Sequence, residues 1–270
     1  MKIEFIKTSP TQNMTIIVKT PVPRDKQFEV GMKLMDYASV NGEQAGFLET
    51  PYNPQADIRL QMMAGEFCGN GTMSAAAYVA REKGIQPGET MRIFMEVSGS
   101  EGIVSCKIEA LNNKFRGTVN MPLPKWTESR EYVIENEKYM LKTIFFPGIR
   151  HIILPKEIAG DNYKKKLEMS VDSLRRQNND EAFGIIVLDE KEMSMEPLVV
   201  VKSSVFWERC CGSGSAAVGV YIAEKKKQSA AVSIKEPGGI MEVIAKYDNG
   251  IKSVSISGNV AIVAEGKAYI

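Results

Sequence analysis

Two cysteines, Cys68 and Cys211, stand in matching sequence contexts. Each begins a Cys-Gly-x-Gly turn, which reads Cys-Gly-Asn-Gly at 68–71 and Cys-Gly-Ser-Gly at 211–214. Each turn is followed by a run of small and apolar residues that ends in charged ones. Such a run, closed by charged residues, is typical of a buried helix. The sequence therefore predicts two helices with a cysteine at the start of each.

A cysteine at the start of a helix is well placed for acid and base chemistry. The unpaired N–H groups of the first turn, with about half a positive elementary charge, stabilise a thiolate and also bind a carboxylate. We expect this environment to lower the pKa of the thiol from ~8.5 toward neutrality. Glycine lets a ligand carboxylate approach the amides closely. The residues expected to bind substrate in the two turns are Gly69, Asn70, Gly71, Gly212 and Ser213.

Two such thiols on opposite faces of one α-carbon would form a two-base racemase. One thiolate removes the α-proton while the other thiol donates a proton to the opposite face, and the reverse reaction exchanges the roles. Only one thiol is expected to be ionised at a time, because like charges in close proximity oppose double ionisation. This chemistry needs no pyridoxal phosphate, so we expect no cofactor.

The remaining cysteines give little support for a metal site, and none is expected. Cys106 lies within a strand pattern, and Cys210 adjoins Cys211 without heading its turn, so both are interpreted as structural. Neighbouring cysteines rarely share one tetrahedral ion, and His151 is the single histidine of the chain. The four cysteines also lack the spacing of a disulfide framework, which favours a cytoplasmic location.

The cysteine motifs belong to a longer internal repeat that supplies the elements around them. Strand candidates precede the motifs at 58–62 and 197–201, and strand-like runs with glycine turns follow both helices. Amphipathic stretches at 28–37 and 156–174 predict an outer helix for each half. The repeat therefore predicts an α+β protein made of two similar halves.

A polar stretch with two prolines at 122–131 is the natural boundary between the halves. The expected domains are therefore residues 1–122 and 131–262. The net charge of +1 over 270 residues provides no global attraction for nucleic acid or an anionic membrane. A small amino-acid substrate fits better, and no apolar run is long enough to span a bilayer.

On these paired motifs the chain resembles the diaminopimelate epimerase superfamily along its whole length. The resemblance implies two pseudo-symmetric domains, each a curved and mostly antiparallel sheet wrapped around a central helix, with the active site in the cleft between them. It also implies that the last strand, near 263–270, returns to the first domain. A homodimer is the assembly expected for this fold.

The resemblance also implies substrate-binding roles for Asn13, Gln44 and His151, which match family positions one by one. Two family asparagines are replaced, by Met62 and near Ala182, and the family Glu-Arg pair falls at about 202–203, where Lys-Ser stands instead. Loss of the ligands for a distal carboxylate argues against diaminopimelate as substrate, because specificity for a polar group needs matched partners.

A closer resemblance is to the histidine racemase branch, whose members make D-histidine for opine-type metallophores. The residues agree with this substrate: an imidazole N–H needs an acceptor, for which Glu43 is well placed in the sequence, and we expect Glu208, three residues before Cys211, to bind the α-ammonium group. The stretches that carry this resemblance are at 12–16, 43–47, 66–70, 207–208, 237–239 and 266–270.

Several alternatives stay open on the sequence alone. The enzyme could be a diaminopimelate epimerase or a racemase of another amino acid, and the same fold could serve as a binding module without turnover. A phenazine-biosynthesis-like isomerase shares the general fold but lacks the paired thiols. Each polar residue also has a plain structural interpretation: a surface acid, a turn cap or a backbone partner.

Overall fold

The computed structural model describes residues 1–178, 182–201 and 204–270. The chain forms two compact units, one of residues 1–121 and 255–270 and the other of residues 122–254. The domains expected from sequence were 1–122 and 131–262 with a return near 263. In the structure β8 already begins at Trp126, and the returning segment of the first unit starts at Ser255.

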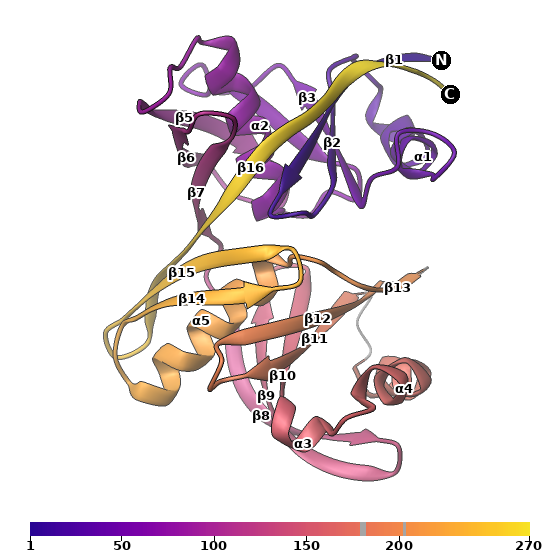
Figure 1. Cartoon of the computed structure of the whole chain (residues 1–270), viewed down its shortest axis with the longest axis vertical. Coiled ribbons are helices and arrows are strands. Elements are labelled where there is room, and N and C mark those ends of the chain that lie inside the picture. Colours follow the sequence, from indigo (N-terminus) through magenta and orange to yellow (C-terminus); the bar gives the residue numbers. More distant parts are fainter. Residues whose placement is uncertain (179–181, 202–203) are drawn as a thin grey trace. The chain divides into compact units, whose positions relative to one another are not determined.

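The first unit is a ring of strands around one helix (Figure 1). The strand order is β1-β2-β3-β4-β5-β6-β7-β16, and β16 also pairs with β1, which closes the ring. The strands are β1 (Lys2–Pro10), β2 (Thr15–Val18), β3 (Gln44–Glu49), β4 (Ile58–Met62), β5 (Thr90–Val97), β6 (Ile103–Ala110), β7 (Phe115–Met121) and β16 (Ile251–Tyr269). The strand predicted at 58–62 is confirmed as β4.

Helix α2 (Gly69–Glu82) contacts every strand from β1 to β7. Ten of its fourteen residues are buried, including Ala75, Ala76 and Ala77. Small side chains allow this close approach: a Cβ on Gly117 of β7 would lie 2.8 Å from Cβ of Met73 on the helix. The small-residue run that the sequence showed after Cys68 is therefore the packing surface of an enclosed helix.

The second unit repeats this plan. Its strands lie in the order β16-β15-β14-β12-β11-β10-β9-β8, and β13 pairs with β12. They are β8 (Trp126–Ile134), β9 (Glu137–Phe146), β10 (Ile149–Pro155), β11 (Ala182–Asp189), β12 (Ser194–Val201), β13 (Ser204–Trp207), β14 (Ala230–Glu236) and β15 (Gly239–Tyr247), with the first residues of β16. Helix α5 (Gly212–Lys226) packs on β9, β10, β14 and β15.

Strand directions show the duplication. In the first unit β2 runs parallel to β3, β3 antiparallel to β4, β4 parallel to β5, and β5 antiparallel to β6. The same alternation recurs along β10, β11, β12, β14 and β15. The predicted α+β fold of two similar halves, each with a buried helix, is therefore confirmed.

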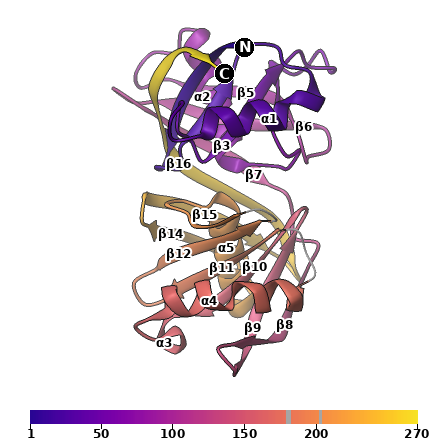
Figure 2. The same cartoon turned by 90° about the vertical axis from the view of Figure 1, so that its right-hand side faces the viewer.

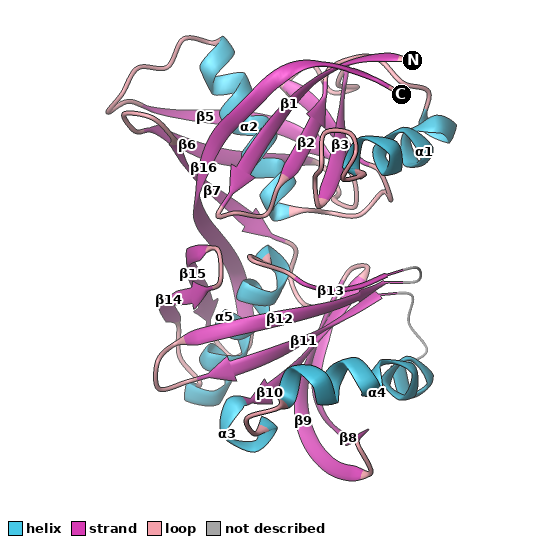
Figure 3. Ribbon diagram, turned by 45° about the vertical axis from the view of Figure 1, so that its right-hand side comes forward, coloured by secondary structure: helices cyan, strands magenta, loops and turns pink. Residues whose placement is uncertain are grey.

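An outer helix covers each unit, as Figures 2 and 3 show for α1 and α4. Val30 and Leu34 of α1 (Arg24–Met35) pack against buried residues of β1, β2 and β3. Leu167, Val171 and Leu174 of α4 (Tyr163–Asn178) pack against β8 to β12. No helix among the described residues is long and apolar enough to cross a membrane.

The predicted bounds of both outer helices were wrong. α1 begins at Arg24 instead of at 28, with Pro23 as its N-cap residue, and it ends at Met35. The stretch predicted as one helix over 156–174 is divided into α3 (Lys156–Ala159) and α4, because Gly160 has a φ of 75°. A left-handed residue ends a helix turn, and glycine adopts it without strain.

Candidate active site

Cys68 is the N-cap residue of α2, and its extended backbone (φ −126°, ψ 113°) directs the side chain back over the first turn. The Gly71 N–H donates to Cys68 Sγ at 3.2 Å, so the sulfur receives one of the amides that a helix start leaves without a backbone partner. The thiol is half-buried. The predicted position of this cysteine at a helix start is therefore confirmed.

A chain of side-chain hydrogen bonds connects Cys68 to a carboxylate. The Cys68 thiol donates to Gln44 Oε1 at 3.0 Å, and Gln44 Nε2 donates to Asn13 Oδ1 at 2.6 Å. Asn13 Nδ2 in turn donates to Glu43 Oε2 at 2.8 Å. We call Asn13, Glu43, Gln44 and Cys68 the first cysteine cluster. Four residues that the sequence nominated separately are thus brought together.

The carboxylate at one end determines the orientation of both amides. A carboxylate accepts hydrogen bonds only, so Asn13 must present its NH₂ group to Glu43 and its oxygen to Gln44. Gln44 then presents its NH₂ group to Asn13 and its oxygen to the thiol. Gln44 Oε1 accepts the proton of the Cys68 thiol, and the Gly71 N–H donates to the sulfur. The surroundings of Cys68 therefore suit both the thiol and the thiolate.

Local backbone structure places the first cysteine cluster. Asn13 is almost fully buried and follows a turn in which Thr11 and Gln12 have positive φ values. Gln44 is the first residue of β3 and pairs with Thr15 of β2, whose Oγ1 accepts from Gln44 Nε2 at 2.7 Å. The cluster therefore depends on the parallel β2–β3 pairing, which the sequence did not reveal.

Two glycines of the first motif are required by packing as well as by access. A Cβ on Gly69 would lie 2.7 Å from Ile256 Cδ1, and one on Gly71 would lie 2.8 Å from Met62 Sδ. Met62 is the residue that replaces a family asparagine, and here its side chain is fully buried. Asn70, between these glycines, is buried in the first turn of α2.

Cys211 is the N-cap residue of α5 and has nearly the same backbone conformation as Cys68 (φ −123°, ψ 102°). Its environment differs, however, since the thiol is buried and makes no capping hydrogen bond to the helix. Ser213 Oγ lies 3.6 Å from the Cys211 sulfur and 2.9 Å from His151 Nε2, and the Glu208 carboxylate also makes a side-chain hydrogen bond with the thiol. We call His151, Glu208, Cys211, Ser213 and Glu236 the second cysteine cluster.

His151 is fully buried on β10, and burial lowers the pKa of its imidazole to about 3. The ring is therefore neutral at physiological pH. Among the described residues Nδ1 has no hydrogen-bond partner, so we assign the proton to Nε2, where it is donated to Ser213 Oγ. The Ser213 hydroxyl hydrogen is then available to the Cys211 sulfur.

Gly184, which the sequence did not single out, makes room for this imidazole. It pairs with His151 across the β10–β11 ladder, and a Cβ there would lie 2.4 Å from Nδ1. The sequence signal was a glycine within the apolar strand Ala182–Asp189, which indicates close approach of another group.

Glu236 is a second residue that sequence reasoning missed. Its carboxyl group is buried at the end of β14 and accepts the Cys211 N–H at 2.7 Å and the Ser215 hydroxyl at 2.6 Å. Burial raises the pKa of Glu236 to about 8, although these hydrogen bonds oppose the shift. The sequence signal that could have identified it is its position two residues after the apolar Ile234, because alternate residues of a strand face the same side and Ile234 is buried.

The expected lowering of the thiol pKa is not found at Cys211. Burial raises the pKa of this thiol well above its ordinary value, and the carboxylates of Glu208 and Glu236 add to the effect. Desolvation and two nearby acids outweigh the partial charge of the helix start. Burial also raises the pKa of Cys106 to about 12 and that of Cys210 well above the ordinary range, in agreement with their structural interpretation.

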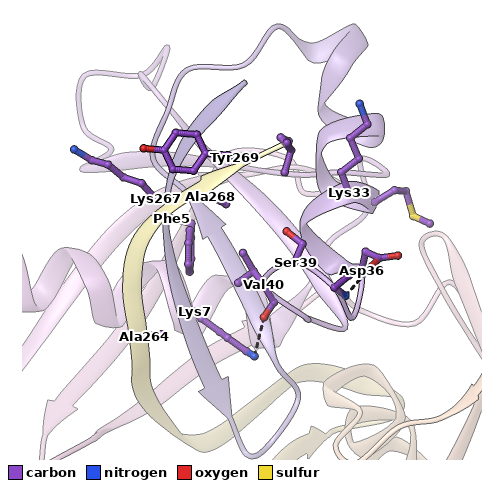
Figure 4. Close-up of a pocket in the computed structure, with 13 residues that line it drawn as sticks. Phe5, Lys7, Lys33, Asp36, Ser39, Val40, Ala264, Lys267, Ala268 and Tyr269 are labelled. Atoms are coloured by element: carbon purple, nitrogen blue, oxygen red, sulfur yellow. Dashed lines mark hydrogen bonds between the residues drawn. The ribbon is translucent and has the colours of Figure 1, made fainter.

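The largest features outside the two cysteine clusters do not add to the candidate site. A hollow of about 920 Å³ on the first unit, shown in Figure 4, is lined by residues of β1, the end of α1 and β16, and contains none of the predicted site residues. The described residues include no group of three or more His, Cys, Asp or Glu side chains able to hold a metal ion. The positions 202–203, to which the family Glu-Arg pair was aligned, lie outside the described residues.

The fold and the two capping cysteines define a class of protein. Solved structures with this fold include a hydroxyproline epimerase from Agrobacterium vitis (TM-score 0.73, 10% identity, 98% of this chain and 92% of that one). They also include a phenazine biosynthesis protein of the PhzF family from Bacillus anthracis (TM-score 0.71, 16% identity, 100% of each chain). The class is that of proteins with this two-unit fold, in which each unit is a set of strands around one buried helix.

Sequence comparison gives the particular family. Residues 2–269 match the family model "Histidine racemase CntK N-terminal domain", and the chain belongs to this family of racemases. A histidine racemase of Fusobacterium nucleatum subsp. nucleatum is 32% identical over 99% of this chain and 97% of its own length. One of Staphylococcus aureus is 28% identical over 99% of this chain and 98% of its own length.

Proposed function

We propose that this protein interconverts L- and D-histidine without a cofactor, with Cys68 and Cys211 as the two acid/base groups. The observation that carries the proposal is the matching placement of a cysteine at the N-cap of α2 and of α5 in a chain of the histidine racemase family. Membership of this family favours histidine over diaminopimelate, since its relatives from Fusobacterium nucleatum and Staphylococcus aureus are histidine racemases.

In the proposed reaction one sulfur removes the α-proton as a thiolate while the other delivers a proton to the opposite face as a thiol. The negative charge that develops on the α-carbon spreads onto the substrate carboxylate. The first amides of α2 and α5, at 69–71 and 212–214, stabilise that charge, because a helix start offers unpaired N–H donors. The reverse reaction exchanges the roles of the two sulfurs.

Carboxylates in both clusters would recognise the remaining polar groups of histidine. Glu43 accepts one bond from Asn13, and a carboxylate has further lone pairs with which to accept an imidazole N–H. Glu208, three residues before Cys211, would bind the α-ammonium group. Neutralisation of Glu208 by that ammonium would also remove one of the charges that oppose ionisation of Cys211.

The test is incubation of the pure protein with L-histidine in deuterium oxide without added cofactor. Two separate bases predict that, at early times, D-histidine carries deuterium at the α-carbon while the remaining L-histidine does not. Loss of optical activity follows at longer times. No exchange into either enantiomer would rule out racemisation of histidine, and a panel with diaminopimelate and other amino acids would then identify the substrate.

Matched cysteine variants test the roles of the two thiols. Cys68→Ser and Cys211→Ser should each lower kcat/KM by about a hundredfold or more, the usual contribution of a general acid or base. Cys106→Ala, which changes a buried cysteine outside both clusters, should retain turnover. Near-normal turnover by either serine variant would contradict the two-thiol mechanism.

A further inference from the structure

Thr15 carries a hydroxyl group in a strand that is otherwise apolar. β2 reads Thr-Ile-Ile-Val, and all four residues are buried, Thr15 completely. Valine has the same shape as threonine and would fill this space without a polar atom to remove from water. A buried hydroxyl group is costly unless it is hydrogen-bonded, so the partners of this one indicate what it does.

Both the hydrogen and the oxygen of the Thr15 hydroxyl are used. The hydrogen is donated to the Asn13 carbonyl at 3.1 Å, so towards Gln44 the oxygen must act as acceptor, and Gln44 Nε2 donates to it at 2.7 Å. Gln44 Nε2 also donates to Asn13 Oδ1 at 2.6 Å. Both amide hydrogens of Gln44 are thus bound to oxygen atoms, and its carbonyl oxygen is directed to Cys68.

The Cys68 sulfur is held at two points. The thiol donates to Gln44 Oε1 at 3.0 Å, and the Gly71 N–H donates to the sulfur at 3.2 Å. Helix α2 fixes the Gly71 N–H, whereas the two anchors of the Gln44 amide fix Oε1. An acid/base group must be placed accurately, since a displacement of about 1 Å costs about a hundredfold in rate.

The second unit contains a corresponding arrangement built from other residues. β10 has the place in the strand order that β2 has in the first unit, and each runs parallel to the next strand. His151 of β10 is fully buried, as Thr15 is. Its imidazole reaches the Cys211 sulfur through the Ser213 hydroxyl. In both units a buried polar residue on the equivalent strand therefore supports the cysteine through one intermediate side chain.

We propose that Thr15 is a positioning residue for Cys68, because its hydroxyl anchors the Gln44 amide that accepts the Cys68 thiol hydrogen and restrains the sulfur. Since Thr15 is fully buried, it acts on the reaction through Gln44 and not by contact with substrate. The part of Cys68 in proton transfer rests on the proposed function, whereas the anchoring of its side chain does not.

Thr15→Val tests the proposal, because it removes the hydroxyl and keeps the shape. It should lower kcat for histidine by about tenfold or more and leave KM within about twofold, because no substrate contact is lost. It should also raise the rate at which iodoacetamide alkylates Cys68 at pH 7.5 by about threefold, because the thiol loses a fixed hydrogen-bond acceptor. Mass spectrometry of the tryptic peptide 60–81, which contains no other cysteine, measures that rate.

Two further variants separate the hydroxyl from packing. Thr15→Ser keeps the hydroxyl and loses a methyl group, so it should retain the kcat and the alkylation rate of the parent even if its melting temperature falls. Thr8→Val is the matched control, because Thr8 is also fully buried and lies opposite Thr15 on β1. Its hydroxyl contacts the Ser74 hydroxyl and the Thr15 carbonyl instead of Gln44, so both rates should stay unchanged.

A folded Thr15→Val protein whose Cys68 is alkylated no faster than in the parent would overturn the proposal. An equal increase in Thr15→Ser or in Thr8→Val would also overturn it, because packing and not the Thr15 hydroxyl would then be responsible. If Thr15→Val does not fold, Thr15→Ala and Thr15→Ser, which differ by the hydroxyl alone, decide the question.

A double variant tests whether Thr15 acts through Gln44. In a Gln44→Met background, Thr15→Val should cause no further change in the alkylation rate of Cys68, and an independent effect would contradict the proposed route. If the parent protein does not racemise histidine, the proposed function fails, and the alkylation rates alone decide whether Thr15 positions Cys68.

Discussion

At the scale of single residues, the environment of each cysteine was harder to predict than its position. The Cys-Gly-x-Gly turns placed both sulfurs at helix starts, and the structure confirms that placement. The pKa of Cys211 nevertheless moves opposite to the expectation, because burial raises it and the carboxylates of Glu208 and of Glu236, a residue more than twenty positions later, add to the effect. The contacts of a buried acid depend on strand register, which a single sequence does not contain.

Because the buried His151 imidazole is neutral, the protein should lose unfolding free energy as the pH falls. Its folded pKa of about 3 lies below the ordinary value of 6.5, so the unfolded chain gains a proton that the folded chain does not as the pH falls through that window. The folding free energy that depends on the neutral ring is present above pH 6.5 and is lost on acidification. At pH 4.5 the loss should be about 2–3 kcal/mol.

Urea unfolding of the parent and of His151→Gln between pH 7.5 and pH 4.5 measures this effect. The difference in unfolding free energy between the two proteins should be constant above pH 6.5 and should shrink below it. Glu236, whose pKa is raised to about 8, acts in the opposite direction in both proteins and cancels in the difference. A difference that does not vary with pH would contradict the neutral buried imidazole.

At the scale of elements, apolar periodicity and glycine turns identified β4 and both enclosed helices. The helix bounds were less accurate, since Gly160 divides a stretch that amphipathicity alone reads as continuous. The sequence did not show which strands pair with one another. The contact of Gly184 with His151 exists only because β10 and β11 run side by side in parallel.

Gly184→Ala tests that strand contact. The added methyl group would lie 2.4 Å from a fully buried imidazole, so the ladder or the ring must shift, and we expect a loss of about 1–3 kcal/mol in unfolding free energy. Gly266→Ala is the control, because its Cβ would meet Phe5 at an ordinary 3.9 Å. Equal stability of the two variants, measured by urea unfolding, would show that the strand tolerates a side chain at 184.

At the scale of the whole molecule, the internal repeat was the most informative feature of the sequence. It predicted two similar halves, and the alternation of parallel and antiparallel pairs shows that the duplication extends through five strands of each unit. The closure of the first unit by β16 came from family resemblance, because no local pattern marks a strand as the partner of one more than 200 residues earlier.

Deletion of residues 263–270 should open the first unit selectively. The deletion removes the pairing of β1 residues 2–7 with residues 264–269 and the packing of Ala268 and Ile270 on the core beneath α1. Hydrogen exchange should then increase over β1, β2 and α1, while β9 to β12 stay protected. Uniform exchange through both units would instead show that the two unfold together.

The return of β16 has a consequence for synthesis on the ribosome. The second unit is one continuous stretch, 122–254, and all of it is synthesised before residues 255–270. The first unit, although translated first, must wait with an unpaired β1 and an unfinished barrel until those last residues emerge. Ribosome-bound chains that end at residue 254 and continue into a linker filling the exit tunnel should therefore be protease-resistant in the second unit and protease-sensitive in the first.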